Sequence, residues 1–502
     1  MAEKPMEKPL VAKKKIRKSS MAPRKASINV RWTGGNPVDL TEEFAVKNAM
    51  VNTMSRRATA FDMKDEGFTG LAAVQGAMES VFEATIAGKT DEKNDMFDDN
   101  PELMTNGQAM LNLLNNCLGS ALLSIGYAVS KLGVIGGAVT IVFAALINRY
   151  TCMMSMETSK IAQQDPATTA ATEMALGKPG KVVQLVVFFG IGFSCMVSYL
   201  TASTDAVVAF LKLAEIEINE KIVTVLVWFF LNFPPSLIRS LQSMATFSMI
   251  AFIGSIFMVG AIIGCSGIKI ASDGINWENI DMFPTSIANF MSGFPTIIMI
   301  FGIQAGTGPI LGGMKDSSDE NIQRQTNRIF TFVIFLFMGI GLTVYLAYDK
   351  STNSDVLKVL PEKDAVGIIA RLGALVLVVL SYMIMMVPCK LAVIESVFGK
   401  NEALMEATLV QYYGTTIGLN IVCLCVALVV SDLAIIFAFL SAFISPVLSW
   451  WLPCGAMIGI LALPDIEGRP KCSIKNLPFW LVILFGVSLC GMGTKTLVEM
   501  FI

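Results

Sequence analysis

The sequence predicts an all-α, polytopic membrane protein. Of its 502 residues, 54% are hydrophobic and 16% are charged, whereas soluble globular chains carry about 25% charged residues. Apolar stretches recur from about residue 107 to the end, and each is long enough to cross a hydrocarbon core of roughly 30 Å. A polar segment of 105 residues precedes them. We therefore expect a membrane domain at 106–502 behind an N-terminal tail at 1–105.

Eleven apolar stretches are expected to cross the bilayer as helices. Their approximate bounds are 107–130, 132–157, 180–212, 222–238, 242–268, 288–311, 329–349, 365–398, 408–431, 433–463 and 477–501. An odd number places the two ends of the chain on opposite sides. The loops that share a side with the N-terminus hold more Lys and Arg than the opposite loops, which predicts a cytosolic N-terminus.

The tail is polar and dense in basic residues. It contains the run K-K-K-I-R-K at 13–18, and residues 1–106 hold 16 of the 38 Lys and Arg. One interpretation is a cytosolic, largely disordered segment. The other is contact with a protein or with anionic lipid, to which each basic residue near the surface adds about 1 kcal/mol. The net charge is −2, and we expect no nucleic-acid partner.

The residue types that are missing exclude several kinds of chemistry. The chain has no His, so Ser–His and Cys–His hydrolase sites and His-ligated metals are excluded. Its ten Cys are scattered without a C-x-x-C motif, and most lie in apolar stretches where Cys acts as a small hydrophobe. We expect no enzyme activity, no cofactor, no disulfide framework and no transition-metal site.

Two apolar stretches contain residues that weaken helices. The first reads N-N-C-L-G-S-A-L-L-S-I-G-Y-A at 115–128, and the sixth carries Gly302, Gly306, Gly308 and Pro309. A Gly inside a helix costs about 1 kcal/mol relative to Ala, and a Pro about 3 kcal/mol. Interrupted helices at matching positions of two five-helix halves point to the midplane site of a transporter.

Unwinding explains the residue types at these positions. It bares backbone N–H and C=O groups that lipid cannot satisfy, so each break must line a polar cavity within the protein. The N–H groups at the start of a half-helix can hold a carboxylate, and free carbonyls can coordinate a cation or an ammonium. Asn115 adds a neutral oxygen that Na⁺ accepts. The alternative is that Gly119 and Ser120 only allow close packing of two helices.

Four segments carry a resemblance to a known family. N-L-L-N-N-C-L-G-S-A-L-L-S-I-G-Y-A resembles the first-helix signature of the amino acid/auxin permease family, within the amino acid-polyamine-organocation superfamily. The nearest branch is that of the sodium-coupled neutral amino acid transporters. The segments F-G-I-Q-A-G-T-G-P-I-L-G-G-M-K-D, I-A-R-L-G-A-L-V-L-V-V-L-S-Y-M-I-M-M-V-P-C-K and I-F-A-F-L-S-A-F-I-S-P-V-L-S-W-W-L-P resemble its sixth, eighth and tenth helices. The similarity runs from about residue 107 to the end.

The resemblance implies a leucine-transporter-like 5+5 inverted repeat with eleven transmembrane helices. The repeats would lie at about 107–268 and 288–463, followed by an extra helix at about 477–501. The implied function is secondary active transport of amino acids, neutral by default, through alternating access. The expected location is the plasma membrane or a vacuolar or lysosomal-type membrane. The sequence does not specify which amino acid is carried.

The resemblance also assigns candidate site residues. Those for substrate binding are Asn116, Gly119, Ser120, Ala121, Tyr199, Phe301, Gly302 and Gln304. Those for cation binding are Asn115, Leu118 and Ser381. Gln304 departs from the family, whose members often carry His near this point. The neutral oxygens of Asn115 and Ser381 favour Na⁺ slightly over H⁺ as the coupling ion, and uniport stays open.

The charged residues Asp205, Arg371 and Glu395 lie inside the expected spans. At the centre of a lipid-facing helix each would cost about 2.5–3.5 kcal/mol, so they should face the bundle or an interface. Charge complementarity predicts that Arg371 is a gate or a partner of Asp205. The alternative is that each lies near the end of a span and extends to water.

One alternative function uses the same fold. The chain could be an amino-acid-sensing receptor that signals through its N-terminal tail. An integral-membrane enzyme is disfavoured by the residue types that are missing.

Overall fold

Helices form the regular structure of the residues that the computed structural model describes. These are 104–119, 121–164, 168–239, 241–312, 314–361, 363–398, 407–430 and 432–501. The tail through residue 103 is not among the described residues. The prediction that this tail is cytosolic and largely disordered therefore lies outside what the structure describes. The described residues begin with a capping box, in which Thr105 and Gln108 start the first membrane helix at Asn106.

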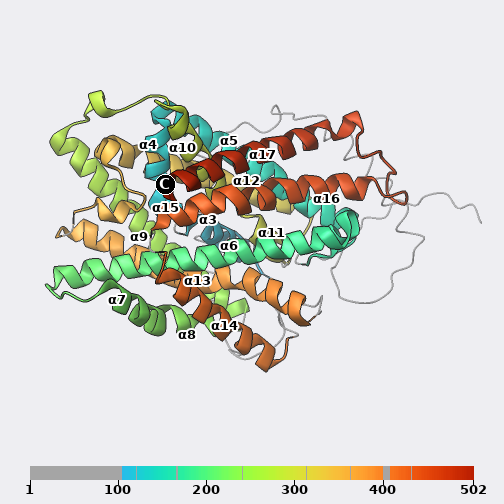
Figure 1. The fold of residues 1–502 in the computed structure, drawn as a ribbon, viewed down its shortest axis with the longest axis horizontal. Helices are drawn as coiled ribbons and strands as arrows, with labels where there is room; N and C mark the ends of the chain where they lie inside the picture. The colour runs from blue at the N-terminus through green and yellow to red at the C-terminus, as the bar shows by residue number, and fades with distance from the viewer. Residues whose placement is uncertain are drawn as a thin grey trace, which may run out of the picture. The chain divides into compact units, whose positions relative to one another are not determined.

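The helices follow the order of the expected stretches (Figure 1). Up to residue 273 they are α3 (Asn106–Leu118), α4 (Ala121–Leu132), α5 (Val134–Ile161), α6 (Ala170–Leu213), α7 (Glu220–Val227), η1 (Trp228–Asn232), α8 (Phe233–Ser236) and α9 (Leu241–Asp273). Up to residue 398 they are η2 (Trp277–Asn279), α10 (Ile287–Ile300), α11 (Gln304–Gly312), α12 (Asp319–Tyr348), η3 (Asp349–Ser351), η4 (Val356–Lys358) and α13 (Ala365–Phe398). The last are α14 (Leu409–Ala427), α15 (Leu433–Phe439), η6 (Leu440–Ile444), η7 (Val447–Trp451), α16 (Leu452–Leu461), η8 (Ile474–Asn476) and α17 (Leu477–Phe501).

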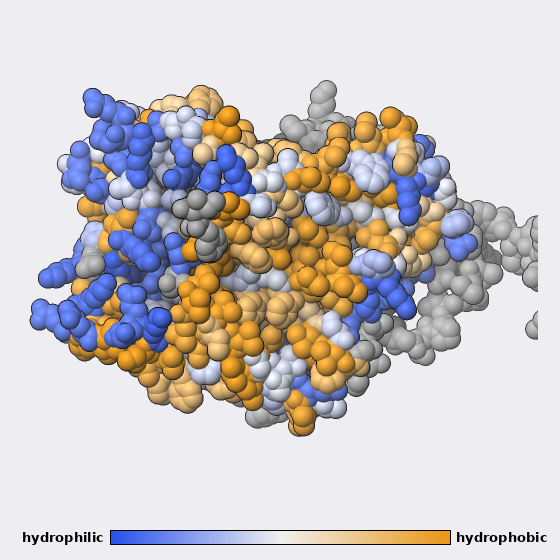
Figure 2. Space-filling view, in the orientation of Figure 1, coloured by the Kyte–Doolittle hydropathy of each residue, from blue (hydrophilic) through white to orange (hydrophobic). Residues whose placement is uncertain are grey.

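Many of these helices, alone or joined to a neighbouring piece, have the length and apolarity of a membrane crossing. Within the described residues, nine helical segments meet both criteria, and the bent pair α3–α4 makes a tenth. The stretch expected at 222–238 is formed instead by three short pieces, α7, η1 and α8, because a π-helix and two prolines interrupt it. Figure 2 shows a broad band of apolar side chains across the visible face, with hydrophilic residues gathered beside it.

The interrupted helices are packed among longer ones. α3 contacts α9, α11 and α12, while α10 contacts α4 and α5. α13 packs along both α6 and α9, and α6 runs beside it in Figure 1. In this arrangement α5, α6, α12 and α13 surround the two helix breaks. The exposed backbone of the breaks is therefore kept away from lipid, which cannot satisfy its polar groups.

Candidate functional site

The first break lies between α3 and α4. α3 ends at Leu118, and Gly119 has φ −6° and ψ −145°, which is not helical. The axes of the two half-helices differ by 53°. A Cβ at position 119 would overlap the hydroxyl of Tyr199 on α6, so a larger residue fits there only if that ring moves. Ser120 and the side chain of Ala121 lie outside the described residues.

The second break lies between α10 and α11. α10 ends at Ile300, and α11 begins at Gln304. Across the gap, Gly302 N donates to Met299 O at 2.9 Å and Ile303 N to Phe301 O at 3.0 Å, which are short turns and not α-helical bonds.

Two contacts join the breaks. Cys117 Sγ on α3 donates to Ile300 O, the last carbonyl of α10, at 3.8 Å. The amide of Asn116 lies against Gly306 on α11, where a Cβ would collide with it. The C-terminal end of each first half-helix therefore lies beside the other break.

Both breaks border one cavity, which we call the break cavity. It encloses about 540 Å³ of space that atoms do not fill, its open mouth included. Its lining residues are Asn116, Cys117, Gly119, Ile191, Cys195, Tyr199, Met299, Ile300, Gly302, Ile303, Ala305, Gly306, Met385, Phe437 and Leu440. This lining combines exposed peptide groups and one amide with a largely apolar wall.

The predicted substrate residues divide into two groups. Asn116, Gly119, Tyr199 and Gly302 line the break cavity. Phe301 does not, because its fully buried ring packs edge-on against Phe337 of α12, with the ring centroids 5.2 Å apart. The prediction that the side chain of Phe301 lines the break is therefore corrected.

Gln304 also turns away from the break cavity. Its Nε2 donates to Asn148 Oδ1 and to Thr151 Oγ1 on α5, both at 3.1 Å. Its Oε1 accepts from Ser449 Oγ of η7 at 3.0 Å. Because both ends of the amide are satisfied, the side chain fixes the start of α11 between α5 and η7. The prediction that it lines the break is corrected to this anchoring position.

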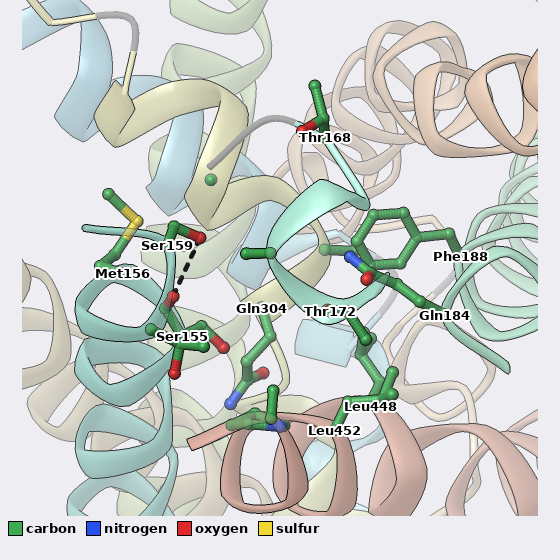
Figure 3. A pocket seen from close by; sticks show the side chains of 16 residues that line it. Ser155, Met156, Ser159, Thr168, Thr172, Gln184, Phe188, Gln304, Leu448 and Leu452 are labelled. Atoms are coloured by element: carbon green, nitrogen blue, oxygen red, sulfur yellow. Dashed lines mark hydrogen bonds between the residues drawn. The ribbon is translucent and has the colours of Figure 1, made fainter. Parts of the chain in front are cut away.

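A second cavity, which we call the side cavity, lies beside the start of α11 (Figure 3). It encloses about 600 Å³, including its mouth. Its lining residues are Ser155, Met156, Thr158, Ser159, Thr168, Ala171, Thr172, Gln184, Phe188, Gln304, Ala305, Gly308, Leu448, Leu452, Pro453 and Ala456. Figure 3 shows Gln304 between the helix that carries Ser155 and the segment that carries Thr172. Since Ala305 borders both cavities, the first turn of α11 separates them.

The residues predicted to bind a cation lie close together next to the first break. Ser381 Oγ on α13 donates to Asn115 Oδ1 at 3.0 Å, and each residue is 1% exposed. Asn115 Nδ2 is buried and has no hydrogen-bond partner among the described residues. A half-turn of this amide would direct Nδ2 to the hydroxyl and free Oδ1 for a cation. Leu118 ends α3, and carbonyls in a last turn lack partners within the helix.

The predicted gating pair does not form. Asp205 Oδ2 lies 3.0 Å from Lys358 Nζ. Arg371 donates instead to the backbone carbonyls of Leu357, Leu360 and Pro361. The partners of both charged residues lie in the loop between α12 and α13. The prediction paired only residues within the expected spans and did not consider this loop.

The third charged residue, Glu395, is tied within the bundle. It contacts Lys181 at 2.9 Å and accepts a hydrogen bond from Thr169 Oγ1 at 2.5 Å. Both partners lie on or beside α6, so Glu395 faces the bundle as its desolvation cost requires.

Sequence reasoning missed part of the cavity wall. Cys195 lies four residues before Tyr199, so both side chains share one face of α6, and this spacing was a usable signal. Cys117 lies inside the first motif itself. Met385, Phe437 and Leu440 gave no signal, because apolar residues on later helices look the same whether they face lipid, core or cavity.

Comparisons with known proteins identify a matching family and several similar transporters. The profile of the family described as "Transmembrane amino acid transporter protein" matches residues 103–499. Vacuolar amino acid transporter 2 of Saccharomyces cerevisiae is 21% identical over 81% of this chain and 86% of its own length. Vacuolar amino acid transporter 5 of Schizosaccharomyces pombe is 22% identical over 69% and 82%. Sodium-coupled neutral amino acid transporter 7 of Bos taurus is 21% identical over 59% and 65%.

One solved structure indicates the fold. MhsT, determined in complex with L-phenylalanine, superimposes with a TM-score of 0.52 at 13% identity. The match covers 79% of this chain and all of that one. The predicted leucine-transporter-like, all-α fold class is thereby confirmed.

Proposed function

Because this chain belongs to the transmembrane amino acid transporter family, we propose that it carries neutral amino acids and binds them in the break cavity. As a member of this family, the chain is a multi-pass membrane protein and a transporter of amino acids, as the sequence predicted. Its relatives are transporters and not enzymes. The proposal concerns the substrate class, the site and the coupling ion.

The observation that carries the proposal is that both helix breaks open on one cavity without charged side chains. Among its described lining residues there is no Asp, Glu, Lys or Arg. The N–H groups that start α4 and α11 suit a carboxylate, and the carbonyls that end α3 and α10 suit an ammonium. The substrate's own side chain would meet Ile191, Met385 and Phe437, so a charged one would find no counter-charge.

We further propose that a cation binds beside this cavity and drives transport. Asn115, Leu118 and Ser381 would supply neutral oxygens, which suit Na⁺ better than a proton. The site adjoins the first break, so the cation and the substrate would stabilise the same arrangement of α3 and α13. This link would make the transporter a symporter, working in a vacuolar or a plasma membrane.

Uptake into proteoliposomes tests the proposal. The purified full-length protein is reconstituted, and a panel of labelled amino acids is supplied at two pH values, with Na⁺ or with choline outside. We expect saturable uptake of neutral amino acids that falls when choline replaces Na⁺. Folded protein that transports charged amino acids and no neutral ones would contradict the proposed substrate class.

A further inference from the structure

The loop between α12 and α13 contains a segment that closes over one end of the bundle. We call residues 352–361 the lid segment; it includes η4. Val356, Leu357 and Leu360 of this segment are almost completely buried. The segment follows span seven, so by the expected topology it faces the non-cytosolic side.

Hydrogen bonds and one ion pair fasten the lid segment to α4, which begins at the first break, and to helices that line the break cavity. Ser124 Oγ on α4, five residues past Gly119, donates to Ser354 O at 2.6 Å. Lys358 Nζ lies 3.0 Å from Asp205 Oδ2 on α6, six residues past Tyr199. Both attachments therefore sit one to two helical turns beyond the cavity wall.

Arg371 on α13 provides the third attachment. Its guanidinium donates to Leu357 O, Leu360 O and Pro361 O, each at 2.9 Å. Since α6 and α13 line the break cavity and α4 begins at the first break, the lid segment joins the outer ends of helices around the site. Opening the bundle at this end requires these contacts to separate.

A carboxyl group lies buried in the middle of these attachments. Asp355 is 1% exposed, and its Oδ1 accepts from Leu357 N at 2.9 Å. Its Oδ2 is buried without a hydrogen-bond partner among the described residues. The nearest cations are already engaged, Lys358 with Asp205 and Arg371 with carbonyls. An ionised carboxylate is costly in such a place, whereas a protonated one carries no charge.

The charged neighbours come from three elements. Asp205 faces Asp355 from α6, Lys358 from η4 and Arg371 from α13, while α4 contributes the uncharged Ser124. Burial raises the pKa of Asp355 to about 7, and the carboxylate of Asp205 adds to the rise. The N–H of Leu357 and the cations Lys358 and Arg371 lower it by less.

We propose that Asp355 is a proton-binding site that controls the lid segment, which closes when this carboxyl is protonated and opens when it is ionised. With the lid open, the exposed carboxyl would have an ordinary pKa of about 4. Closure then takes up a proton between pH about 4 and about 7. The stabilisation of the closed lid is fully present below this window and is lost as pH rises through it, by up to ~tenfold per pH unit.

This inference extends the proposed transport function, but its test does not depend on transport. Hydrogen–deuterium exchange of the lid amides is measured for the full-length protein in nanodiscs at pH 5 and pH 8 and at intervals between them, with exchange times corrected for the pH dependence of the intrinsic amide exchange rate. In the native protein we expect protection of the lid amides to fall by up to ~100-fold between pH 5 and pH 7, with little further change to pH 8.

Two variants assign the effect to Asp355. Asp355→Asn, which mimics the protonated form, should keep the lid protected at both pH values. Asp364→Asn removes an exposed carboxylate just beyond the lid segment and should behave like the native protein. Equal protection of the native lid at both pH values would overturn the proposal, as would unchanged pH dependence in Asp355→Asn.

A third variant covers the case in which Asp355→Asn fails to fold. Asp205→Asn removes the carboxylate that helps to raise the pKa of Asp355, so the midpoint of the exchange transition should move to lower pH. An unmoved midpoint would refute the proposal. If the protein carries no amino acid in any assay but shows these shifts, the transport proposal fails and the lid switch stands.

Discussion

Gly119 connects the first break to the wall of the break cavity. Tyr199 occupies the space that any larger residue at position 119 would need. We expect Gly119→Ala to displace the ring or the break and to reduce uptake at least ~tenfold, because displacements of about 1 Å at a binding site have effects of this size or larger. Proteoliposome uptake by protein shown to be folded is the measurement.

The matched control is Gly267→Ala on α9. A Cβ at position 267 meets nothing within 4 Å, and Ala favours a helix interior over Gly. This variant should transport as the native protein does. Native-like uptake by Gly119→Ala would mean that the first break does not shape the site.

The Ser381 hydroxyl supports the proposed cation site. Ser381→Ala removes the partner of Asn115 Oδ1 and one neutral oxygen ligand. We expect the Na⁺ concentration for half-maximal uptake to rise about tenfold, which corresponds to about 1.4 kcal/mol, with little change in uptake at saturating Na⁺. An unchanged Na⁺ dependence would place the cation elsewhere.

At the residue scale, the sequence predicted some positions of the site and missed others. The glycines of the two breaks could be found because their effect is on the local backbone. Gln304 lay at the right position in the chain, but its direction depends on partners from α5 and η7 that are remote in sequence. Asp355 gave no signal, because its burial results from the packing of a loop against three helices.

At the scale of elements, the amide of Gln304 anchors the start of α11 to α5 and η7. Gln304→Ala would remove the hydrogen-bond partner of the buried Asn148 Oδ1 and Ser449 Oγ, while Thr151 keeps its bond to Asn148 O. We expect a loss of about 1–3 kcal/mol in stability, measured as a lower thermal unfolding temperature.

Ser449→Ala is the milder comparison for this prediction. It removes one hydrogen bond to Gln304 and leaves the two bonds to α5 in place, so its effect should be clearly smaller. Equal stability of Gln304→Ala and the native protein would show that α11 is held by other contacts.

The elements themselves were largely predictable. Long apolar runs fixed the positions of most helices, because an isolated helix is the simplest way to satisfy the backbone in lipid. The stretch at 222–238 was predicted as one span; its paired prolines are visible in the sequence, but the π-helix before them could not be predicted from composition. The lid segment was treated as a loop because it lacks a hydrophobic period.

For the whole molecule, alternating access requires one side of the site to close while the other opens. The attachments of the lid segment make closure on that side sensitive to pH. We therefore expect uptake from the lid side to fall as the pH on that side drops from 7 to 5, because protonation of Asp355 favours closure. Asp355→Asn should abolish this dependence, and an opposite trend in the native protein would contradict the account.

The most direct test of the account uses two native thiols. Cys117 and Cys195 line the break cavity, whereas Cys472 is exposed in the loop before α17. Alkylation of each is followed by mass spectrometry in nanodiscs, with and without an amino acid that the protein transports. Binding at the breaks predicts slower alkylation of Cys117 and Cys195 and an unchanged rate at Cys472. A transported amino acid that leaves all three rates unchanged would contradict binding in the break cavity.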